Sequence, residues 1–96
     1  MAAAYVIAHI DVTDPGKYDE YKRAAFDSVA KYGGKYLVRG PKPEILEGTG
    51  DVKRLVLLEF PSVERAREWW RSPEYAAAKA RRKGAASGQF ILLEGI

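Results

Sequence analysis

Three segments of this sequence are apolar at both odd and even positions, and this feature restricts what the chain can fold into. A strand with one face on a core and the other in water alternates apolar and polar side chains. Here both sets of positions are largely apolar in residues 5–12, 53–60 and 90–94. The opposing sets are Val6, Ala8, Ile10 and Val12 against Tyr5 and Ile7, Val56, Leu58 and Phe60 against Leu55 and Leu57, and Phe90 and Leu92 against Ile91 and Leu93. A sheet built from these strands needs cover on both faces.

Helices are expected between these strands. Asp14 stands before Pro15, and Ser72 stands before Pro73. Each pair places a capping side chain ahead of a proline at the first helical position. We expect one helix over residues 15–32, ended by a Gly-Gly pair, and two more over residues 62–83, the first capped by Ser62. The first helix has an apolar stripe at helical spacing, formed by Tyr18, Tyr21, Ala25, Val29 and Tyr32.

The order of elements predicts the fold class. Residues 35–39 are expected to form a strand that Gly40, Pro41 and Pro43 interrupt, because proline cannot donate to a central ladder. We expect the strand to resume at the sheet edge over residues 44–47 and to turn back through residues 48–51. The chain then reads as a single α+β domain over residues 1–96. It has β-α-β-β-α-β order and a four-stranded antiparallel sheet with helices on one face.

The bare face of this sheet predicts a homodimer. Helices can cover only one face, so the other apolar face remains exposed in a single copy. The simplest closed arrangement is a two-fold dimer that packs sheet against sheet. The alternative is a monomer with an unusually apolar face.

Composition argues against several classes of function. The chain has no cysteine and one histidine, which disfavours a conventional zinc site, and we expect neither a metal nor a cofactor. The net charge is only +3, and the basic run over residues 79–83 is placed to complement a helix C-terminus, so we expect no nucleic-acid partner. No apolar run is long enough to span a bilayer, and the first residues lack the basic region of a signal peptide. We expect a cytoplasmic protein that does not bind membranes.

The chemistry-bearing residues of the first strand suggest a catalytic group. His9 and Asp11 share a face of this strand, where the carboxylate could orient the imidazole. We expect the strands over residues 5–12 and 53–60 to be parallel neighbours, which would place Asp11 near Glu59, and we expect Arg39 to face the same side. We predict a pocket between sheet and helices in which His9 is the acid or base. Arg39 would bind an anionic or enolate oxygen there.

Aromatic side chains are predicted to wall this pocket. Tyr18 and Tyr21 come from the first helix, and Trp69 and Trp70 from the second. Together with Glu59 they are candidate substrate-binding residues. The alternative is a structural role for each of them: a buried hydrogen-bonded histidine, aromatic core packing, a polar residue at a strand end and an exposed or ion-paired arginine.

A set of short segments runs in order along nearly the whole chain. They are Ile10-Asp11-Val12-Thr13-Asp14-Pro15 with Tyr18 and Tyr21, Tyr32-Gly33-Gly34-Lys35-Tyr36-Leu37-Val38-Arg39-Gly40, Leu46-Glu47-Gly48, Glu59-Phe60-Pro61-Ser62, Ser72-Pro73-Glu74-Tyr75 and Leu93-Glu94-Gly95-Ile96. In these segments the chain resembles the family of domain of unknown function 1330 (DUF1330), within the dimeric α/β-barrel superfamily.

The resemblance implies a ferredoxin-like fold that pairs into a dimeric α/β barrel, with a pocket between sheet and helices. It implies no particular activity. Other members of the superfamily include cofactor-free monooxygenases, lactone isomerases and haem enzymes, but none of their catalytic motifs matches this chain. We therefore expect a cofactor-independent oxygenase or isomerase acting on a small anionic or enolisable molecule. The alternatives are a non-catalytic module that binds or senses a small molecule and an interaction protein without a pocket.

Overall fold

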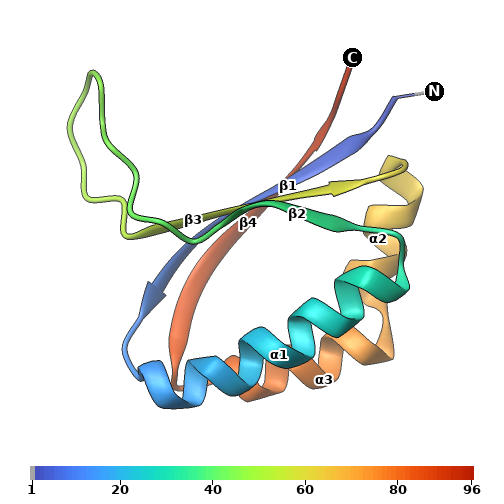
Figure 1. Cartoon of the computed structure of the whole chain (residues 1–96), viewed down its shortest axis with the longest axis horizontal. Coiled ribbons are helices and arrows are strands. Elements are labelled where there is room, and N and C mark those ends of the chain that lie inside the picture. Colours follow the sequence, from blue (N-terminus) through green and yellow to red (C-terminus); the bar gives the residue numbers. More distant parts are fainter. Residues whose placement is uncertain (1) are drawn as a thin grey trace.

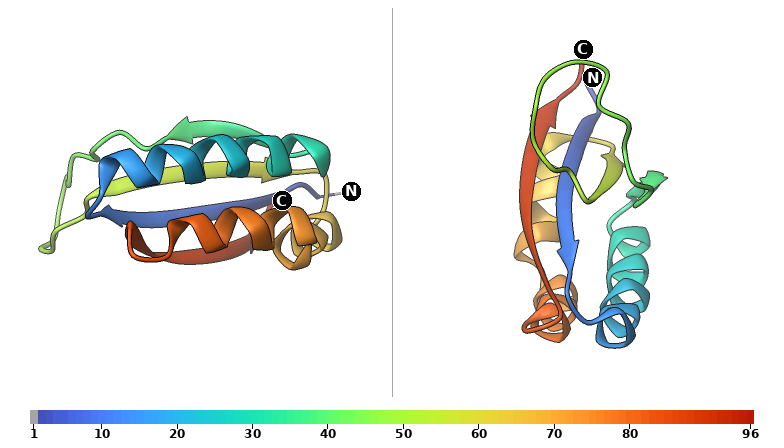
Figure 2. Two further views of the ribbon diagram at one scale, coloured as in Figure 1. Left: turned by 90° about the horizontal axis from the view of Figure 1, so that it is seen from below. Right: turned by 90° about the vertical axis from the view of Figure 1, so that its left-hand side faces the viewer.

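The computed structural model, which describes residues 2–96, has one sheet with three helices on one face (Figures 1 and 2). Its elements are β1 (Ala4–Val12), α1 (Pro15–Lys31), β2 (Lys35–Arg39), β3 (Arg54–Phe60), α2 (Val63–Arg71), α3 (Pro73–Arg82) and β4 (Ala86–Glu94). The strands lie in the order β2-β3-β1-β4, and every neighbouring pair is antiparallel. The predicted ferredoxin-like fold is confirmed.

The predicted helix starts are present. The Asp14 carboxylate accepts a hydrogen bond from the backbone N–H of Lys17 at 3.2 Å, which caps α1. Ser62 and Ser72 cap α2 and α3 in the same way. The Ser62 hydroxyl accepts from the backbone N–H of Arg65 at 3.1 Å, and the Ser72 hydroxyl accepts from that of Tyr75 at 3.0 Å. These side chains satisfy N–H groups that have no partner inside the helix.

The core lies between the sheet and the helices. The even-numbered residues of β1 face the helices, and those from Ala4 to Ile10 are at most 5% exposed. The predicted stripe of α1 packs against them, and Trp69 of α2 and Tyr75 of α3 complete the layer. β1 and α1 supply eight buried apolar residues to this core: Ala4, Val6, Ala8, Ile10, Tyr18, Tyr21, Ala25 and Val29.

One predicted strand relation is wrong: β1 and β3 are antiparallel. α1 carries the chain over the sheet so that β2 runs in the direction of β1, and β3 returns beside β2, antiparallel to both. Glu59 therefore lies opposite Tyr5, while Ile10 lies opposite Arg54. Asp11 is at the far end of the strand pair from Glu59, so these two carboxylates do not meet.

The predicted edge strand over residues 44–47 and its hairpin turn are also wrong. Residues 40–53 form a loop without strand structure, and it projects on the side of the sheet away from the helices (Figure 1). Two prolines at its start remove ladder donors, and β2 is an edge strand that offers no second partner. Gly48 and Gly50 adopt φ angles of 103° and 129°, a backbone conformation that favours glycine.

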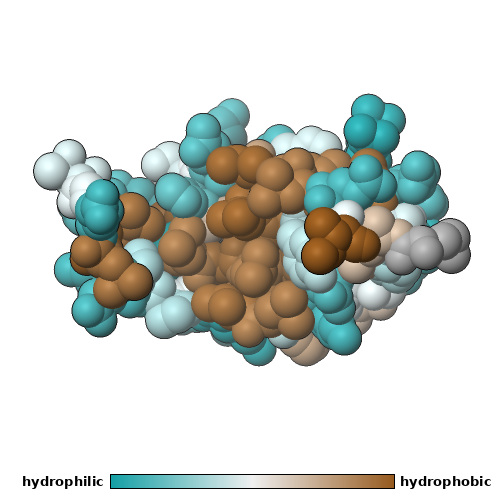
Figure 3. Space-filling model, turned by 90° about the horizontal axis from the view of Figure 1, so that it is seen from above, coloured by the Kyte–Doolittle hydropathy of each residue, from teal (hydrophilic) through white to brown (hydrophobic). Residues whose placement is uncertain are grey.

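The sheet face away from the helices carries an apolar row across all four strands. Ile7 lies between Leu57 and Ile91, and Leu57 lies opposite Val38. The space-filling view of this face shows a continuous hydrophobic area over the sheet (Figure 3). In the single chain, Ile91 is 38% exposed and Leu93, on the same face, is 46% exposed. The prediction that both faces of the sheet are apolar is confirmed.

Gly34 lies where α1 and β3 approach each other closely, and a larger residue at this position would clash. A Cβ atom at this position would lie 2.6 Å from Cε1 of Phe60 and 2.8 Å from Cγ1 of Val29, both in the core. We expect Gly34→Ala to lower the free energy of unfolding by about 1–3 kcal/mol, measured by urea denaturation. Gly16→Ala is the control, because the nearest atom to its Cβ is 3.8 Å away. A Gly34→Ala variant as stable as Gly16→Ala would contradict the expected clash.

Candidate functional site

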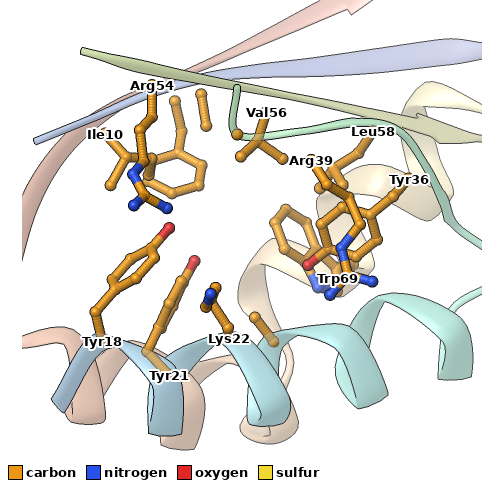
Figure 4. Close-up of a pocket in the computed structure, with 14 residues that line it drawn as sticks. Ile10, Tyr18, Tyr21, Lys22, Tyr36, Arg39, Arg54, Val56, Leu58 and Trp69 are labelled. Carbon is orange, nitrogen blue, oxygen red and sulfur yellow. The ribbon is translucent and has the colours of Figure 1, made fainter. Parts of the chain in front are cut away.

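A narrow pocket lies between α1 and the sheet, and its lining differs from the predicted set of residues (Figure 4). The cavity volume is about 40 Å³, so the space is narrow. Lys22 and Arg39 also line a wider surface hollow beside α1. The side chains and backbone of the pocket come from Ala8, Ile10, Tyr18, Tyr21, Lys22, Ala25, Tyr36, Arg39, Gly40, Arg54, Val56, Leu58, Trp69 and Phe90.

A β-bulge in β2 directs Arg39 into this pocket. Tyr36 lies opposite Leu58, but the next pairs are Val38 with Leu57 and Arg39 with Val56, so the register shifts at Leu37. The extra residue reverses the alternation of side chains along the rest of the strand. Without it, Arg39 would face the opposite side from Tyr36. With it, both side chains lie on the helix side.

Aromatic rings hold the Arg39 guanidinium in place. Its carbon lies 5.0 Å from the ring centres of both Phe26 and Tyr36, and these two rings stack at 5.7 Å. Such contacts favour a planar cation over a ring face. Burial raises the pKa of Tyr36 to about 12, against the opposing effect of the Arg39 charge, so its hydroxyl stays protonated at neutral pH.

Arg54 and Tyr18 form another part of the pocket wall. The Arg54 side chain extends from the start of β3 towards α1, and its guanidinium carbon is 5.8 Å from the Tyr18 ring centre (Figure 4). Gly40 lies beside the Arg54 side chain, and its φ of 79° is a backbone conformation that favours glycine. Burial raises the pKa of Tyr18, and the positive charges of Arg54 and Arg82 oppose this increase.

A buried tyrosine pair lies behind the pocket. The hydroxyls of Tyr21 and Tyr75 are 2.9 Å apart and share a hydrogen bond, and burial raises the pKa of both side chains. The guanidinium of Arg82 packs nearby, 5.4 Å from the Tyr21 ring centre and 4.6 Å from that of Phe90. Arg82 is 9% exposed, and within residues 2–96 its Nη1 has no hydrogen-bond partner. A buried cation in this condition favours an anion close by.

The charged side chains that line the pocket are all positive. Lys22, Arg39 and Arg54 contribute cations, and no described residue of the lining is acidic. Lys22 has a carboxylate neighbour, Asp19, 3.1 Å away and one turn earlier on α1. The potential inside the pocket is therefore positive, and the neutral tyrosines can donate hydrogen bonds. This combination suits an anionic ligand.

Four of the predicted site residues line the pocket: Tyr18, Tyr21, Arg39 and Trp69. Trp69 has a structural task as well, since its indole N–H donates to Oγ of Ser28 at 3.0 Å and its ring packs on Phe60. That these residues bind or act on a substrate stays a prediction.

The other four lie elsewhere. The prediction that His9 and Asp11 stand in the pocket is wrong in its geometry, because odd-numbered residues of β1 face away from the helices and both side chains are exposed there. His9 and Asp11 do not share a face with Arg39, because they lie on the open face while the bulge turns Arg39 to the helix side. Glu59 is on that open face too, 3.1 Å from the ammonium of Lys35. Trp70 is 38% exposed and lines an apolar groove between α2 and β4.

Three pocket residues with polar side chains were not predicted from the sequence: Lys22, Tyr36 and Arg54. Tyr36 and Val38 lie on opposite faces because the bulge falls between them, so their two-residue spacing gave no usable signal. Arg54 shares its even parity with the buried residues Leu58 and Phe60 of β3, which placed it on the helix side. Lys22 directly follows the buried Tyr21, and nothing in the sequence marks it for the pocket.

The described residues, 2–96, form neither a metal-ion cluster nor a membrane-spanning helix. No group of three or more His, Cys, Asp or Glu side chains is placed to hold a metal ion. None of the helices has the length and apolar character to cross a bilayer.

Comparison with known proteins places this fold in a family. The family described as domain of unknown function 1330 matches residues 3–96. The chain belongs to the DUF1330 family. No curated protein matches the chain. The family description assigns no activity, so membership in DUF1330 supports the fold but does not name a substrate.

Solved structures similar to this DUF1330 chain share its fold at low sequence identity. A protein of unknown function from Rhodopseudomonas palustris has a TM-score of 0.78 and 21% identity over 99% of this chain and 83% of its own. A cofactor-independent oxygenase from Streptomyces nogalater has a TM-score of 0.70 and 12% identity over 97% and 92%. A dimeric ferredoxin-like protein of unknown function from Thermobifida fusca has a TM-score of 0.67 and 13% identity over 99% and 92%. At these identities the likeness is one of fold.

Proposed function

We propose that the pocket between α1 and the sheet binds a small, flat, anionic or enolisable molecule, and that the protein oxidises it with molecular oxygen without a cofactor. The observation that carries this proposal is the positive charge of the pocket lining. Lys22, Arg39 and Arg54 surround a narrow aromatic space, and none of the described lining residues is acidic. The fold likeness to a cofactor-independent oxygenase supports the choice of reaction class.

The lining suits stabilisation of an anion better than proton abstraction. Burial raises the pKa of Tyr18, Tyr21 and Tyr36, so these hydroxyls act as neutral hydrogen-bond donors at pH 7. The described lining holds no histidine or carboxylate that could serve as a base. Cations aimed at an enolate or phenolate oxygen lower the cost of forming the electron-rich anion that reacts with oxygen. This favours an oxygenase over an isomerase, which needs a group to move protons.

A non-catalytic binding module is the second candidate. It uses the same cationic pocket, and the same absence of a base among the described walls favours it. The two candidates differ in turnover, so oxygen consumption separates them.

The homodimer is part of this proposal. The apolar row on the open sheet face supports it, as does the fold likeness to a dimeric ferredoxin-like protein. The pocket opens on the helix side, so a partner on the open face leaves it accessible.

Binding of an anion tests the pocket. We expect cinnamate to bind and the neutral, equally shaped cinnamamide to bind at least about 10-fold more weakly, measured by calorimetry. Arg54→Gln should weaken cinnamate binding by about 10- to 100-fold, because it removes a charged hydrogen-bond donor. Arg81→Gln, at an exposed position on α3, is the matched control and should leave the affinity unchanged. Equal binding of cinnamate and cinnamamide would reject the anion pocket.

Oxygen uptake tests the reaction. The electron-rich acid 1,4-dihydroxy-2-naphthoate oxidises slowly in air, and we expect the protein to raise the rate of oxygen consumption above this background, with saturation. Arg39→Gln should remove most of the increase, while Arg81→Gln should keep it. Binding of this acid without any increase in oxygen consumption would favour the non-catalytic module.

A further inference from the structure

We propose that the pocket recognises a flat conjugated acid with acidic oxygens at opposite ends: a carboxylate that binds Arg54 and Tyr18, and a phenol or enol oxygen that binds Arg39. This inference rests on the proposed function of the pocket and adds the class of ligand and its orientation.

The two guanidinium groups are held apart, each on its own aromatic support. Figure 4 shows Arg54 with Tyr18 at one side of the pocket and Arg39 with Tyr36 at the other. Arg39 is fixed on the rings of Phe26 and Tyr36, and Arg54 extends past Gly40 towards α1. A ligand with a single small charge can contact one of these cations but not both. A ligand that uses both needs acceptors at separated points.

Neither guanidinium is neutralised by the protein. Among the ion pairs of the described chain, none includes Arg39 or Arg54. Each guanidinium has five N–H donors in a planar fork that matches carboxylate and enolate oxygens. Both are therefore available for charge-assisted hydrogen bonds to a ligand.

Arg82 makes the Tyr18 side the more positive of the two. This buried guanidinium lies against Tyr21 and Phe90, which both line the pocket, and its Nη1 has no partner among the described residues. The Tyr18 hydroxyl feels the charges of both Arg54 and Arg82. The group that is always ionised at neutral pH, a carboxylate, belongs where the potential is highest, and Tyr18 can donate a further hydrogen bond to it.

The Arg39 side suits a weaker acid. Arg39 is exposed and lines the surface hollow as well as the pocket, so its charge is partly screened by water. It still favours the ionised form of a phenol or enol that comes within hydrogen-bond distance. The narrow space between these ends selects a flat molecule, and the rings of Tyr18, Tyr21 and Trp69 can pack on it.

A series of three ligands and two variants tests this orientation. The ligands are 4-hydroxycinnamate with both groups, cinnamate with the carboxylate alone, and methyl 4-hydroxycinnamate with the phenol alone. We expect 4-hydroxycinnamate to bind about 10-fold or more tightly than cinnamate in calorimetry, because of the second charged hydrogen bond. Its absorption should move to longer wavelength on binding as the phenol ionises.

The variants assign the two ends. Arg39→Gln should reduce the advantage of 4-hydroxycinnamate over cinnamate to about 2-fold or less and abolish the absorption change, with cinnamate binding retained. Arg54→Gln should weaken both acids by about 10- to 100-fold and the methyl ester by less than about 3-fold. Arg81→Gln should match the unchanged protein throughout.

The possible failures are distinguishable. If cinnamate binds selectively but the hydroxyl adds no affinity, or if Arg39→Gln weakens both acids equally, the two-ended orientation is wrong and the anion pocket stands. If no member of the series binds more tightly than its neutral counterpart, the proposed function fails first.

Discussion

Replacing Trp69 by alanine is expected to lower the free energy of unfolding by about 3–5 kcal/mol. The side chain is 1% exposed and packs between the sheet and two helices, with ring centres of Phe60 and Tyr75 at 5.2 and 4.3 Å. Its loss leaves a cavity beside the candidate pocket. It also removes the indole donor from Oγ of Ser28, a side chain that is itself buried.

Trp70 is the matched control for this prediction. The two tryptophans are adjacent in sequence, but Trp70 is 38% exposed, and Lys79 lies over its ring at 4.5 Å. We expect Trp70→Ala to cost about 1 kcal/mol, measured for both variants by urea denaturation followed by circular dichroism. Equal losses for the two variants would mean that Trp69 is not the centre of the core. Since domains are stable by only about 5–15 kcal/mol, Trp69→Ala is also expected to unfold at a much lower urea concentration.

The helices could be predicted because their signals are local. A capping oxygen and a proline fix the starts of α1 and α3 within a few residues, and a stripe at helical spacing identifies the buried side of α1. Tyr18 and Tyr21 lie where that stripe requires. The residues of the pocket that come from α1 were found for this reason.

The site residues on the sheet were harder to predict because they depend on register. A strand alternates strictly, so one extra residue at Leu37 moves Arg39 to the other face, and no residue in this segment marks the bulge. The direction of β3 relative to β1 decides whether Glu59 lies near Asp11, and that direction is set by connections over more than forty residues of chain. Local pattern does not carry such information.

The orientation of His9 follows from the alternation of side chains along β1. The even-numbered residues of β1 are the more apolar set, so the helices take that face and the odd-numbered His9 turns away from the pocket. The chemistry of a lone histidine suggested a catalytic role, while the pattern around it already favoured the open face. His9 lies on the open face, between Leu55 and Gln89.

A single charge in the apolar row is expected to separate the proposed dimer. In Ile7→Asp the carboxylate would stand between Leu57 and Ile91, at the middle of the open face. Leaving such a charge unpaired in a dry interface costs about 4 kcal/mol, which weakens the dimer about 1000-fold, and two-fold symmetry introduces the charge twice. Sedimentation at micromolar concentration should therefore give the mass of one 10.7 kDa chain for the variant and twice that for the unchanged protein.

Ala77→Asp, an exposed position on α3, introduces the same charge away from the sheet and should stay dimeric. The variant Ile7→Asp should keep its circular dichroism spectrum, because position 7 in a single copy is on the solvent side of the sheet and Asp there disturbs no core contact. Cinnamate binding should survive in the separated chain, since the pocket lies on the helix side. If Ile7→Asp were still a dimer, the two copies would have to meet elsewhere. If the unchanged protein were a folded monomer, the hydrophobic area of Figure 3 would need another occupant.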